Sequence, residues 1–374
     1  MVALNTVNTA ASGDPMAEDK LADYLQSVAT TFGFPAQRLA VSGRADNLLL
    51  RCEFGPQRPW LLFESHMDTV TAEGMTIEPL SGRIHNGRLW GRGACDTKGT
   101  GAAMLWALRQ YTAESDRPNN IAVLFTVDEE DGMLGVRSFV ANDLPRLAIR
   151  FAAAVVGEPT MLRPIVTHNG LVRWRVTTRG VAAHSATPWK GRSAISTMVR
   201  VIEAIESRYA SSLKAEHPLT GRAQCSVNVV RGGTQVNVIP DTCTIDIDRR
   251  VVPGEDPQGV LPAVQALLDD LTAEHQDLDA RQALTYMAPP LNADGTGPWN
   301  KAVQRALARL DRPVDPCGAP YATDGGELGT AGLPTIVIGP GDIAQAHTKD
   351  EWVTLDQLHQ GVRLYLELMR SDPL

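Results

Sequence analysis

Four apolar runs in this chain stop abruptly, and each is followed shortly by histidine or carboxylate residues. Each run is short, is rich in Val, Ile, Leu, Phe or Ala, and does not alternate with polar positions, which is typical of a strand buried on both faces. Such strands belong to a parallel sheet covered by helices. The runs and the residues that follow them are PWLLFES before His66 and Asp68, IAVLFTV before Glu129 and Glu130, FAAAVV before Glu158, and TIVIGPG before His347.

The polar residues after these runs are predicted to share one edge of the sheet. Parallel sheets bind ligands in the crevice at the carboxyl ends of their strands. Neutral imidazole nitrogens and ionised carboxylate oxygens suit divalent metals, zinc in particular. Asp96 directly precedes the helical stretch that begins at Gly99, so we predict it at a strand-to-helix turn. The pattern therefore indicates a metal-dependent hydrolase.

The middle of the chain has a different pattern, in which apolar and polar positions alternate. Alternating stretches such as LVRWRVTTRG and CTIDIDRRV are separated by helical ones such as AISTMVRVIEAIESRYASSL. This arrangement favours an antiparallel sheet with one covered face. We therefore predict an α/β fold: a mostly parallel-sheet catalytic domain, residues 1–165 and 285–374, interrupted by an inserted α+β domain, residues 166–284. Near the N-terminus, MAEDKLADYLQSVATTFG predicts a helix that ends at Gly33.

Composition narrows the function classes. A chain of 374 residues is long enough for two domains, and its net charge of −8 argues against nucleic acid as a partner. No apolar run approaches the roughly 18–20 residues of a membrane span, and the first fifteen residues lack the features of a secretory signal. The five scattered cysteines favour reduced thiols, so we expect a cytoplasmic protein.

Several motifs together resemble one known family. In chain order they are HMD, GRGACDTKG, TVDEEDG, VVGEPT and GPGDIAQAHTKDE. Three further segments, GVAAHSATPWKGRSAI, GGTQVNVIPD and DRRVVPG, resemble the inserted domain of the same family. This series is similar to the signature of the co-catalytic zinc aminoacylase, carboxypeptidase and acetylornithine deacetylase family, and is closest to the acetylornithine deacetylase branch. The resemblance implies a zinc-peptidase catalytic domain, an inserted lid and dimerisation domain, a homodimer, and two Zn²⁺ ions per subunit for which Co²⁺ can substitute.

The resemblance also implies a role for each metal-site residue. Asp96 would bridge the two metals, His66 and Glu158 would complete one site, and Glu130 and His347 would complete the other. Carboxylates are needed because two neighbouring dications repel unless anions neutralise them.

Catalytic and substrate-binding residues follow from the same resemblance. Glu129 would be the general base, and Asp68 would orient the first histidine ligand. His184 would stabilise the oxyanion in the active site of a partner subunit. Arg250, with Asn237 nearby, would hold the α-carboxylate of the substrate.

Each of these residues has an ordinary explanation when it is taken alone. An HxD sequence is common, a DEED cluster is often a solvated turn, and an isolated histidine in a charged loop is usually at the surface. The metal interpretation depends on all of them following strand ends in family order. For His184 the ordinary explanation is an exposed imidazole on a loop, and for Arg250 a surface charge beside Arg249.

The substrate class is the least determined property. Removal of an N-acyl group from an amino acid such as acetylornithine is our first expectation. A dipeptidase, a carboxypeptidase and a succinyl-diaminopimelate desuccinylase remain alternatives within the family, and a binding homologue without catalysis is an alternative of another class. Two residues depart from the family pattern, Thr100 in place of Gly and Ser193 in place of Asn.

Overall fold

The protein divides into two compact units in the computed structural model, which describes residues 1–293 and 295–374. Unit 1 comprises residues 1–167, 291–318 and 323–374. Unit 2 comprises residues 168–290 and 319–322. The second unit is therefore an insertion into the sequence of the first.

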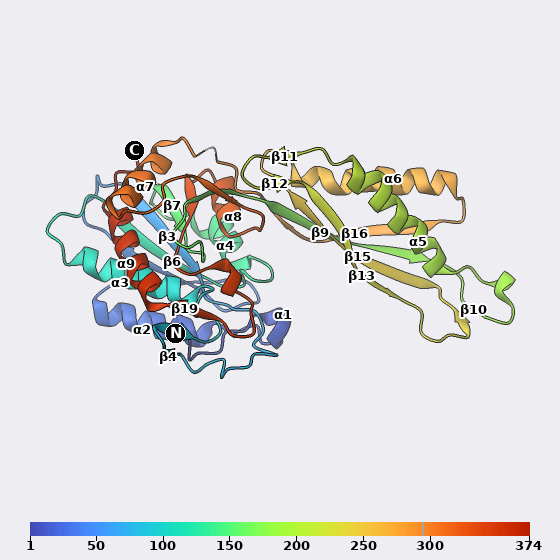
Figure 1. Ribbon diagram of the computed structural model, residues 1–374, viewed down its shortest axis with the longest axis horizontal. Helices are drawn as coiled ribbons and strands as arrows, with labels where there is room; N and C mark the ends of the chain where they lie inside the picture. Colours follow the sequence, from blue (N-terminus) through green and yellow to red (C-terminus); the bar gives the residue numbers. More distant parts are fainter. Residues whose placement is uncertain (294) are drawn as a thin grey trace. The chain divides into compact units, whose positions relative to one another are not determined.

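An eight-stranded sheet forms the centre of unit 1. Its strands are β1 (Ala36–Leu39), β2 (Asn47–Cys52), β3 (Trp60–His66), β6 (Asn120–Thr126), β7 (Phe151–Val156), β8 (Ile165–His168), β17 (Cys317–Ala319) and β18 (Thr335–Val337). Their order is β1-β2-β6-β3-β7-β18-β8-β17, and the central four, β6, β3, β7 and β18, run parallel (Figure 1). All four apolar runs of the sequence lie in these parallel strands, so the predicted mostly parallel sheet is confirmed.

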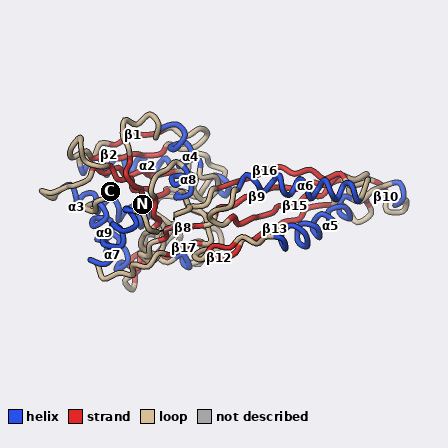
Figure 2. The backbone as a smooth tube through the Cα atoms, turned by 90° about the horizontal axis from the view of Figure 1, so that it is seen from above, coloured by secondary structure: helices blue, strands red, loops and turns tan. Residues whose placement is uncertain are grey.

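Helices bury this sheet. Alternate strand residues, such as Phe63 and Phe125, belong to one hydrophobic cluster with residues of four helices, while their neighbours Leu62 and Leu124 are also fully buried on the opposite face. In this cluster α3 packs against α9 and α9 against α7 (Figures 1 and 2). The four helices are α2 (Asp19–Phe32), α3 (Lys98–Thr112), α7 (Pro298–Arg309) and α9 (Leu355–Met369).

The local signals at helix ends act as expected. Gly33 follows α2 in a left-handed conformation, with φ of 75°, and its N–H donates to the carbonyls of Ala29 and Thr30. Glycine accepts this conformation without the steric cost of a Cβ atom. The helix predicted from Gly99 forms as α3 and begins two residues after Asp96.

Unit 2 consists of an antiparallel sheet with helices on one face. The strands are β9 (Gly170–Arg179), β13 (Gln224–Gly232), β15 (Thr242–Val251) and β16 (Asp279–Ala288), in the order β13-β15-β9-β16. The two helices are α5 (Ala194–Ala204) and α6 (Val260–Glu274). Both helices share a hydrophobic cluster with Trp174 of β9 and Ile247 of β15. The alternating sequence pattern therefore reflects one buried and one open face.

Shorter elements connect these layers. They are α1 (Thr9–Ser12), β4 (Arg83–His85), β5 (Arg88–Trp90), α4 (Leu134–Ser138), β10 (Ala183–His184), β11 (Glu216–His217), β12 (Gly221–Arg222), β14 (Val238–Ile239), α8 (Gly325–Thr330) and β19 (Trp352–Thr354). Two π-helical turns, Phe139–Asp143 and Ile205–Tyr209, extend α4 and α5. Within the described residues, every helix is too short or too polar to span a membrane.

Candidate metal centre

The first residues of the centre lie at the end of β3. His66 is the last residue of this strand and is 3% exposed, and Asp68 follows in full burial. Asp68 Oδ1 lies 3.4 Å from His66 Nδ1 and also accepts the backbone N–H of Glu129 at 3.0 Å, while Oδ2 accepts that of Glu130 at 3.1 Å. One buried carboxylate thus orients the imidazole and positions the acidic pair.

The acidic pair reaches the same edge because β3 and β6 are in parallel register. His66 is paired with Thr126, so the residues after both strands emerge together. The two glutamates then diverge, since Glu130 Oε2 lies 3.0 Å from His347 Nε2. Within the described part of the chain, the carboxylate of Glu129 makes no hydrogen bond or ion pair. The carboxylate of Glu130 is therefore held by His347, whereas that of Glu129 is available for chemistry.

Asp96 occupies the turn before α3, and Glu351 holds this turn in place. Glu351 is fully buried, and its Oε1 accepts the backbone N–H groups of Cys95 at 2.8 Å and Asp96 at 3.0 Å. Its Oε2 accepts from Gly93 N–H at 3.0 Å and from the Arg92 guanidinium at 2.8 Å. The bond between Asp96 and Thr97 is a cis peptide. Four hydrogen bonds to one carboxylate thus fix the backbone that carries Asp96.

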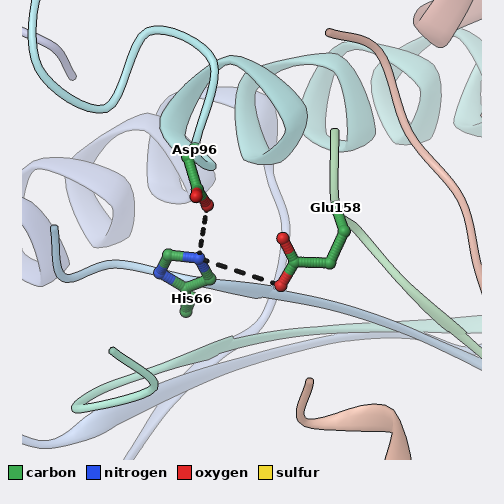
Figure 3. Close-up of side chains that lie close together, drawn as sticks. All are labelled: His66, Asp96 and Glu158. Carbon is green, nitrogen blue, oxygen red and sulfur yellow. Dashed lines mark hydrogen bonds and ion pairs between the residues drawn. The ribbon is translucent and has the colours of Figure 1, made fainter. Parts of the chain in front are cut away.

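Glu158 completes the first group of possible ligands. It follows β7 and is 5% exposed, and the preceding Gly157 lies so close to Thr100 and Met104 that a Cβ atom there would be 2.4 Å and 2.6 Å from their side chains. Figure 3 shows Asp96 and Glu158 directed toward the same nitrogen of His66. His66 Nε2 lies 3.0 Å from Asp96 Oδ1 and 4.0 Å from Glu158 Oε1.

A second group shares Asp96 with the first. His347 Nε2 lies 3.3 Å from Asp96 Oδ2, in addition to its contact with Glu130, and the histidine side chain is half-exposed. One possible ligand atom from each of His66, Asp96 and Glu158 lies within 4.8 Å of the others, and the same holds for Asp96, Glu130 and His347. The structure therefore brings together all five residues that the sequence suggested as ligands, with Asp96 common to both groups.

The electrostatics of the centre favour bound positive charge. Burial raises the pKa values of Glu129 and Glu158 well above their usual range, and neighbouring carboxylates raise them further. Burial alone would lower the pKa of His66, but hydrogen bonds to Asp68 and Asp96 outweigh it and raise the pKa well above the usual value. Hydrogen bonds to Asp96 and Glu130 raise the pKa of His347 to about 10. Carboxylates and imidazoles crowded in this way fit the preferences of a pair of divalent metals.

Sequence reasoning missed residues that support the centre from behind. Besides Glu351, two buried acids, Glu64 and Asp324, interact with Thr126, which is paired with His66 in the sheet. Thr126 Oγ1 is 2.6 Å from Glu64 Oε1 and 3.1 Å from Asp324 Oδ2. Burial raises the pKa of Glu64 to about 7 and that of Asp324 well above its usual value. An acidic residue inside an apolar strand, as Glu64 is, was the one local signal available for this pair.

The role of Glu351 leads to a stability prediction. Glu351→Gln is expected to lower the free energy of unfolding by about 3–5 kcal/mol, because it leaves the buried Arg92 guanidinium without a counter-charge. The measurement is urea denaturation of chelator-treated protein, so that metal binding does not contribute. The matched control is Glu274→Gln, which removes a surface partner of Arg208 and should hardly change stability. Equal effects of the two substitutions would contradict this role.

The remaining predicted site residues lie in unit 2. His184 is exposed in β10, which pairs with β14, and the adjacent Ser185 N–H donates to Asn237 O at 2.9 Å. His184 Nδ1 accepts the N–H of Ala186 at 3.0 Å, so a neutral imidazole carries its proton on Nε2. Arg250 is half-buried in β15, where its Nε donates to Asp248 Oδ1 at 2.7 Å.

The structure corrects one expectation about these residues, because Asn237 is not near Arg250 within a chain. Arg250 pairs with Leu171 at one end of β9, whereas Thr242, which follows the Asn237 segment, pairs with Arg179 at the other end. Eight residues of extended strand separate the two ends by roughly 27 Å. Although the two residues are only 13 positions apart in the sequence, β15 spans the whole sheet between them. Arg250 and Asn237 of one chain therefore cannot hold the same carboxylate.

The two departures from the family pattern have local structural explanations. Ser193 is the N-cap of α5, and its Oγ accepts the N–H of Ser196 at 3.2 Å, so a capping side chain is retained where asparagine was expected. Thr100 is fully buried in α3 and packs at Gly157.

Comparisons with known proteins match this arrangement. The sequence profile of peptidase family M20/M25/M40 matches residues 62–371. The acetylornithine deacetylase of Myxococcus xanthus is 30% identical over 90% of this chain and 88% of its own length, and that of Edwardsiella ictaluri is 27% identical over 91% and 87%. The M20 family metallo-carboxypeptidase Sso-CP2 from Sulfolobus solfataricus has the same fold, with a TM-score of 0.82 at 17% identity over 100% of this chain and 97% of that one.

Proposed function

This chain belongs to peptidase family M20/M25/M40, whose members act on amide bonds, and from that premise we propose that it removes an N-acyl group from an amino acid. Acetylornithine is the first candidate substrate. The observation that carries the proposal is the available carboxylate of Glu129 beside two groups of metal-binding side chains that share Asp96. A water-activating base next to a metal pair is the requirement for amide hydrolysis.

We propose two Zn²⁺ ions as the native metals, with Co²⁺ able to replace them. His66, Asp96 and Glu158 would hold one ion, and Asp96, Glu130 and His347 the other. When bound, the ions supply positive charge that polarises the substrate carbonyl and eases ionisation of water. Asp68 keeps His66 in the orientation that a ligand needs, through the contact between its Oδ1 and His66 Nδ1.

Glu129 acts on protons in both halves of the proposed reaction. It accepts a proton from the attacking water, and its carboxylate is available for this because it makes no hydrogen bond or ion pair among the described residues. The carbonyl carbon becomes tetrahedral, and its oxygen gains negative charge. Glu129 then donates the proton to the leaving nitrogen, which departs as an amine. The acyl group leaves as a carboxylic acid, so the atoms of water are shared between the two products.

His184 and Arg250 are proposed to bind the reacting substrate. The N–H at His184 Nε2 would donate to the oxyanion, and the guanidinium of Arg250 would hold the α-carboxylate. Asn237 lies beside His184. We therefore propose that the partner subunit supplies these two residues to an active site, whereas Arg250 comes from the same chain as the metal ligands. This division removes the conflict created by the distance between Asn237 and Arg250.

A homodimer follows from this assignment, and we propose unit 2 as its lid and dimerisation domain. Among the described strands, β13 pairs only with β15 and leaves its other edge open. Ile195 and Val199 of α5 are exposed close to this strand, as is Val230 within it. An open strand edge beside apolar side chains favours pairing with an identical strand across a two-fold axis. That pairing would form one continuous sheet from two chains.

The choice of a deacylase over a peptidase is supported by the names of the two acetylornithine deacetylases. Dipeptidase or carboxypeptidase activity and succinyl-diaminopimelate desuccinylation are the second candidates within the same family. A binding protein without catalysis would have no need of the half-buried, available Glu129. Five free cysteines fit the proposed cytoplasmic location.

The test is a hydrolysis screen of zinc-loaded and cobalt-loaded protein over N-acetyl, N-succinyl and N-formyl amino acids and dipeptides. We expect the highest kcat/KM for an N-acyl amino acid. Dialysis against a chelator should abolish hydrolysis, and added zinc or cobalt should restore it, with about two ions bound per chain by elemental analysis. Full activity of the stripped protein would refute the metal assignment, and hydrolysis of dipeptides alone would refute the deacylase assignment.

A further inference from the structure

The face of the unit 2 sheet opposite its helices carries a ladder of charged side chains. Strand residues alternate between the two faces, so residues two apart share a face. In β9, Trp174 and Val176 face the helices, whereas Arg173 and Arg175 face away. The residues of the open face that concern us are Arg173 and Arg175 of β9, Asp246, Asp248 and Arg250 of β15, and Arg231 of β13.

On this face, two aspartates form ion pairs with four arginines. Asp248 lies between two guanidinium groups, since its Oδ2 accepts from Arg173 Nε at 2.9 Å and its Oδ1 from Arg250 Nε at 2.7 Å. Asp246 is shared in the same way by Arg175, at 2.6 Å, and Arg231, at 2.9 Å. The six side chains therefore carry a net charge of +2 (four arginines less two aspartates), although the whole chain carries −8.

Three of these four arginines line a groove of about 490 Å³, and Arg231 is not among its lining residues. Arg173, Arg175, Asp246, Asp248 and Arg250 all contribute to its walls. Opposite charges on neighbouring strands stabilise a sheet as pairs. With three arginines and two aspartates in the groove, one cation remains in excess. The excess of cations in a concave surface, with their long side chains about half-exposed, is instead the arrangement that recognises an anionic ligand.

We propose that this groove binds a second carboxylate of the substrate, so that N-acyl amino acids with two acidic groups are preferred over acetylornithine, whose side chain carries an amine. The proposal rests on the proposed function, in which Arg250 holds the α-carboxylate. Arg173 is the arginine placed to receive the second one, because it and Arg250 both donate to the carboxylate of Asp248. A short dicarboxylate can therefore reach both guanidinium groups. The aspartates keep the guanidinium groups oriented while the groove is empty of ligand.

The test compares N-acetyl-L-glutamate with N-acetyl-L-glutamine, which have nearly the same shape and differ in the charge of the side chain. The wild-type protein should favour the glutamate derivative in kcat/KM by about tenfold or more, the effect of roughly 1.4 kcal/mol. Arg173→Gln should remove most of this preference by lowering kcat/KM for the glutamate derivative alone. Arg173 is at the surface, so its replacement should not affect folding.

A matched control distinguishes binding in the groove from the overall electrostatic potential of the protein. Arg281→Gln removes the same charge from the same sheet face, opposite Thr177 and outside the groove, and should leave the preference unchanged. An unaltered preference in Arg173→Gln would overturn the proposal, as would an equal loss in Arg281→Gln. Wild-type protein that hydrolyses both compounds equally well would also overturn it, while leaving deacylation itself intact.

A binding measurement keeps the proposal testable if neither compound is hydrolysed. Glutarate, a dicarboxylate, should raise the melting temperature of the zinc-loaded wild-type protein more than valerate, a monocarboxylate of the same chain length. The difference should disappear in Arg173→Gln and persist in Arg281→Gln. Equal shifts with both acids in the wild-type protein would overturn the dicarboxylate groove. Absence of hydrolysis with a preserved glutarate effect would instead refute the proposed reaction.

Discussion

Glu129→Gln is expected to bind metal normally and to lower kcat by about 10²–10⁴-fold or more, whereas Glu130→Ala should lose metal. The two residues are adjacent in sequence but differ in their contacts. Glu130 contacts His347, and both residues belong with Asp96 to one group of possible metal ligands. The carboxylate of Glu129 is available for proton transfer. Glutamine keeps the size of Glu129 but cannot accept the proton. Metal content by elemental analysis and kcat on the best N-acyl substrate measure the two effects.

The adjacent substitutions act as controls for each other, because the backbone N–H groups of both residues donate to the same Asp68 carboxylate. A general disturbance of this turn would change metal content and kcat together in both variants. If Glu129→Gln lost metal and Glu130→Ala kept it, the assignment of base and ligand would be the reverse of ours.

Mixed dimers of His184→Ala and Glu129→Gln chains are expected to recover about one quarter of wild-type activity, although neither variant alone should turn over appreciably. In a two-fold dimer the contribution of His184 must be reciprocal, so each active site would combine Glu129 of one chain with His184 of the other. A mixed dimer then contains one doubly substituted site and one intact site. With random exchange, half of the dimers are mixed, so about a quarter of all sites are intact.

The measurement is activity after co-refolding of the two variants, with mixed dimers verified by differently tagged chains. Each variant refolded alone provides the baseline. Inactive mixed dimers would show that His184 acts within its own chain. Near wild-type activity of the His184→Ala homodimer would show that this exposed histidine has no part in the reaction.

Several features of the fold and the centre could be predicted because they depend on short segments. The strand ending at His66 is recognisable from seven consecutive residues, and Gly33 ends its helix through its own backbone conformation. Residues placed directly after parallel strands must gather at one sheet edge, so the positions of His66, Glu130 and Glu158 follow from local pattern. Asp96 and His347 lie in loops that do not directly follow a strand of this sheet, and the folded chain brings them to the same edge. The alternation in β9 and β15 similarly predicted an antiparallel sheet with one covered face.

Other features depend on residues that are far apart in the sequence, and no local pattern contains them. Glu351 supports Asp96 across 255 residues, and Asp324 reaches Thr126 across 198. In both cases burial gives an acidic side chain its role, and burial is a property of the packed chain.

The sequence by itself determined which residues carry the proposed chemistry, whereas the tertiary structure decided which of them can act together. Asn237 and Arg250 are close in the sequence, but an intervening full-length strand places them at opposite ends of the sheet. Arg173 and Arg250 are distant in the sequence, but strand register places both at Asp248. The sequence gives the type of each side chain directly. Strand register depends on the pairing of whole strands, so only the folded chain specifies the register.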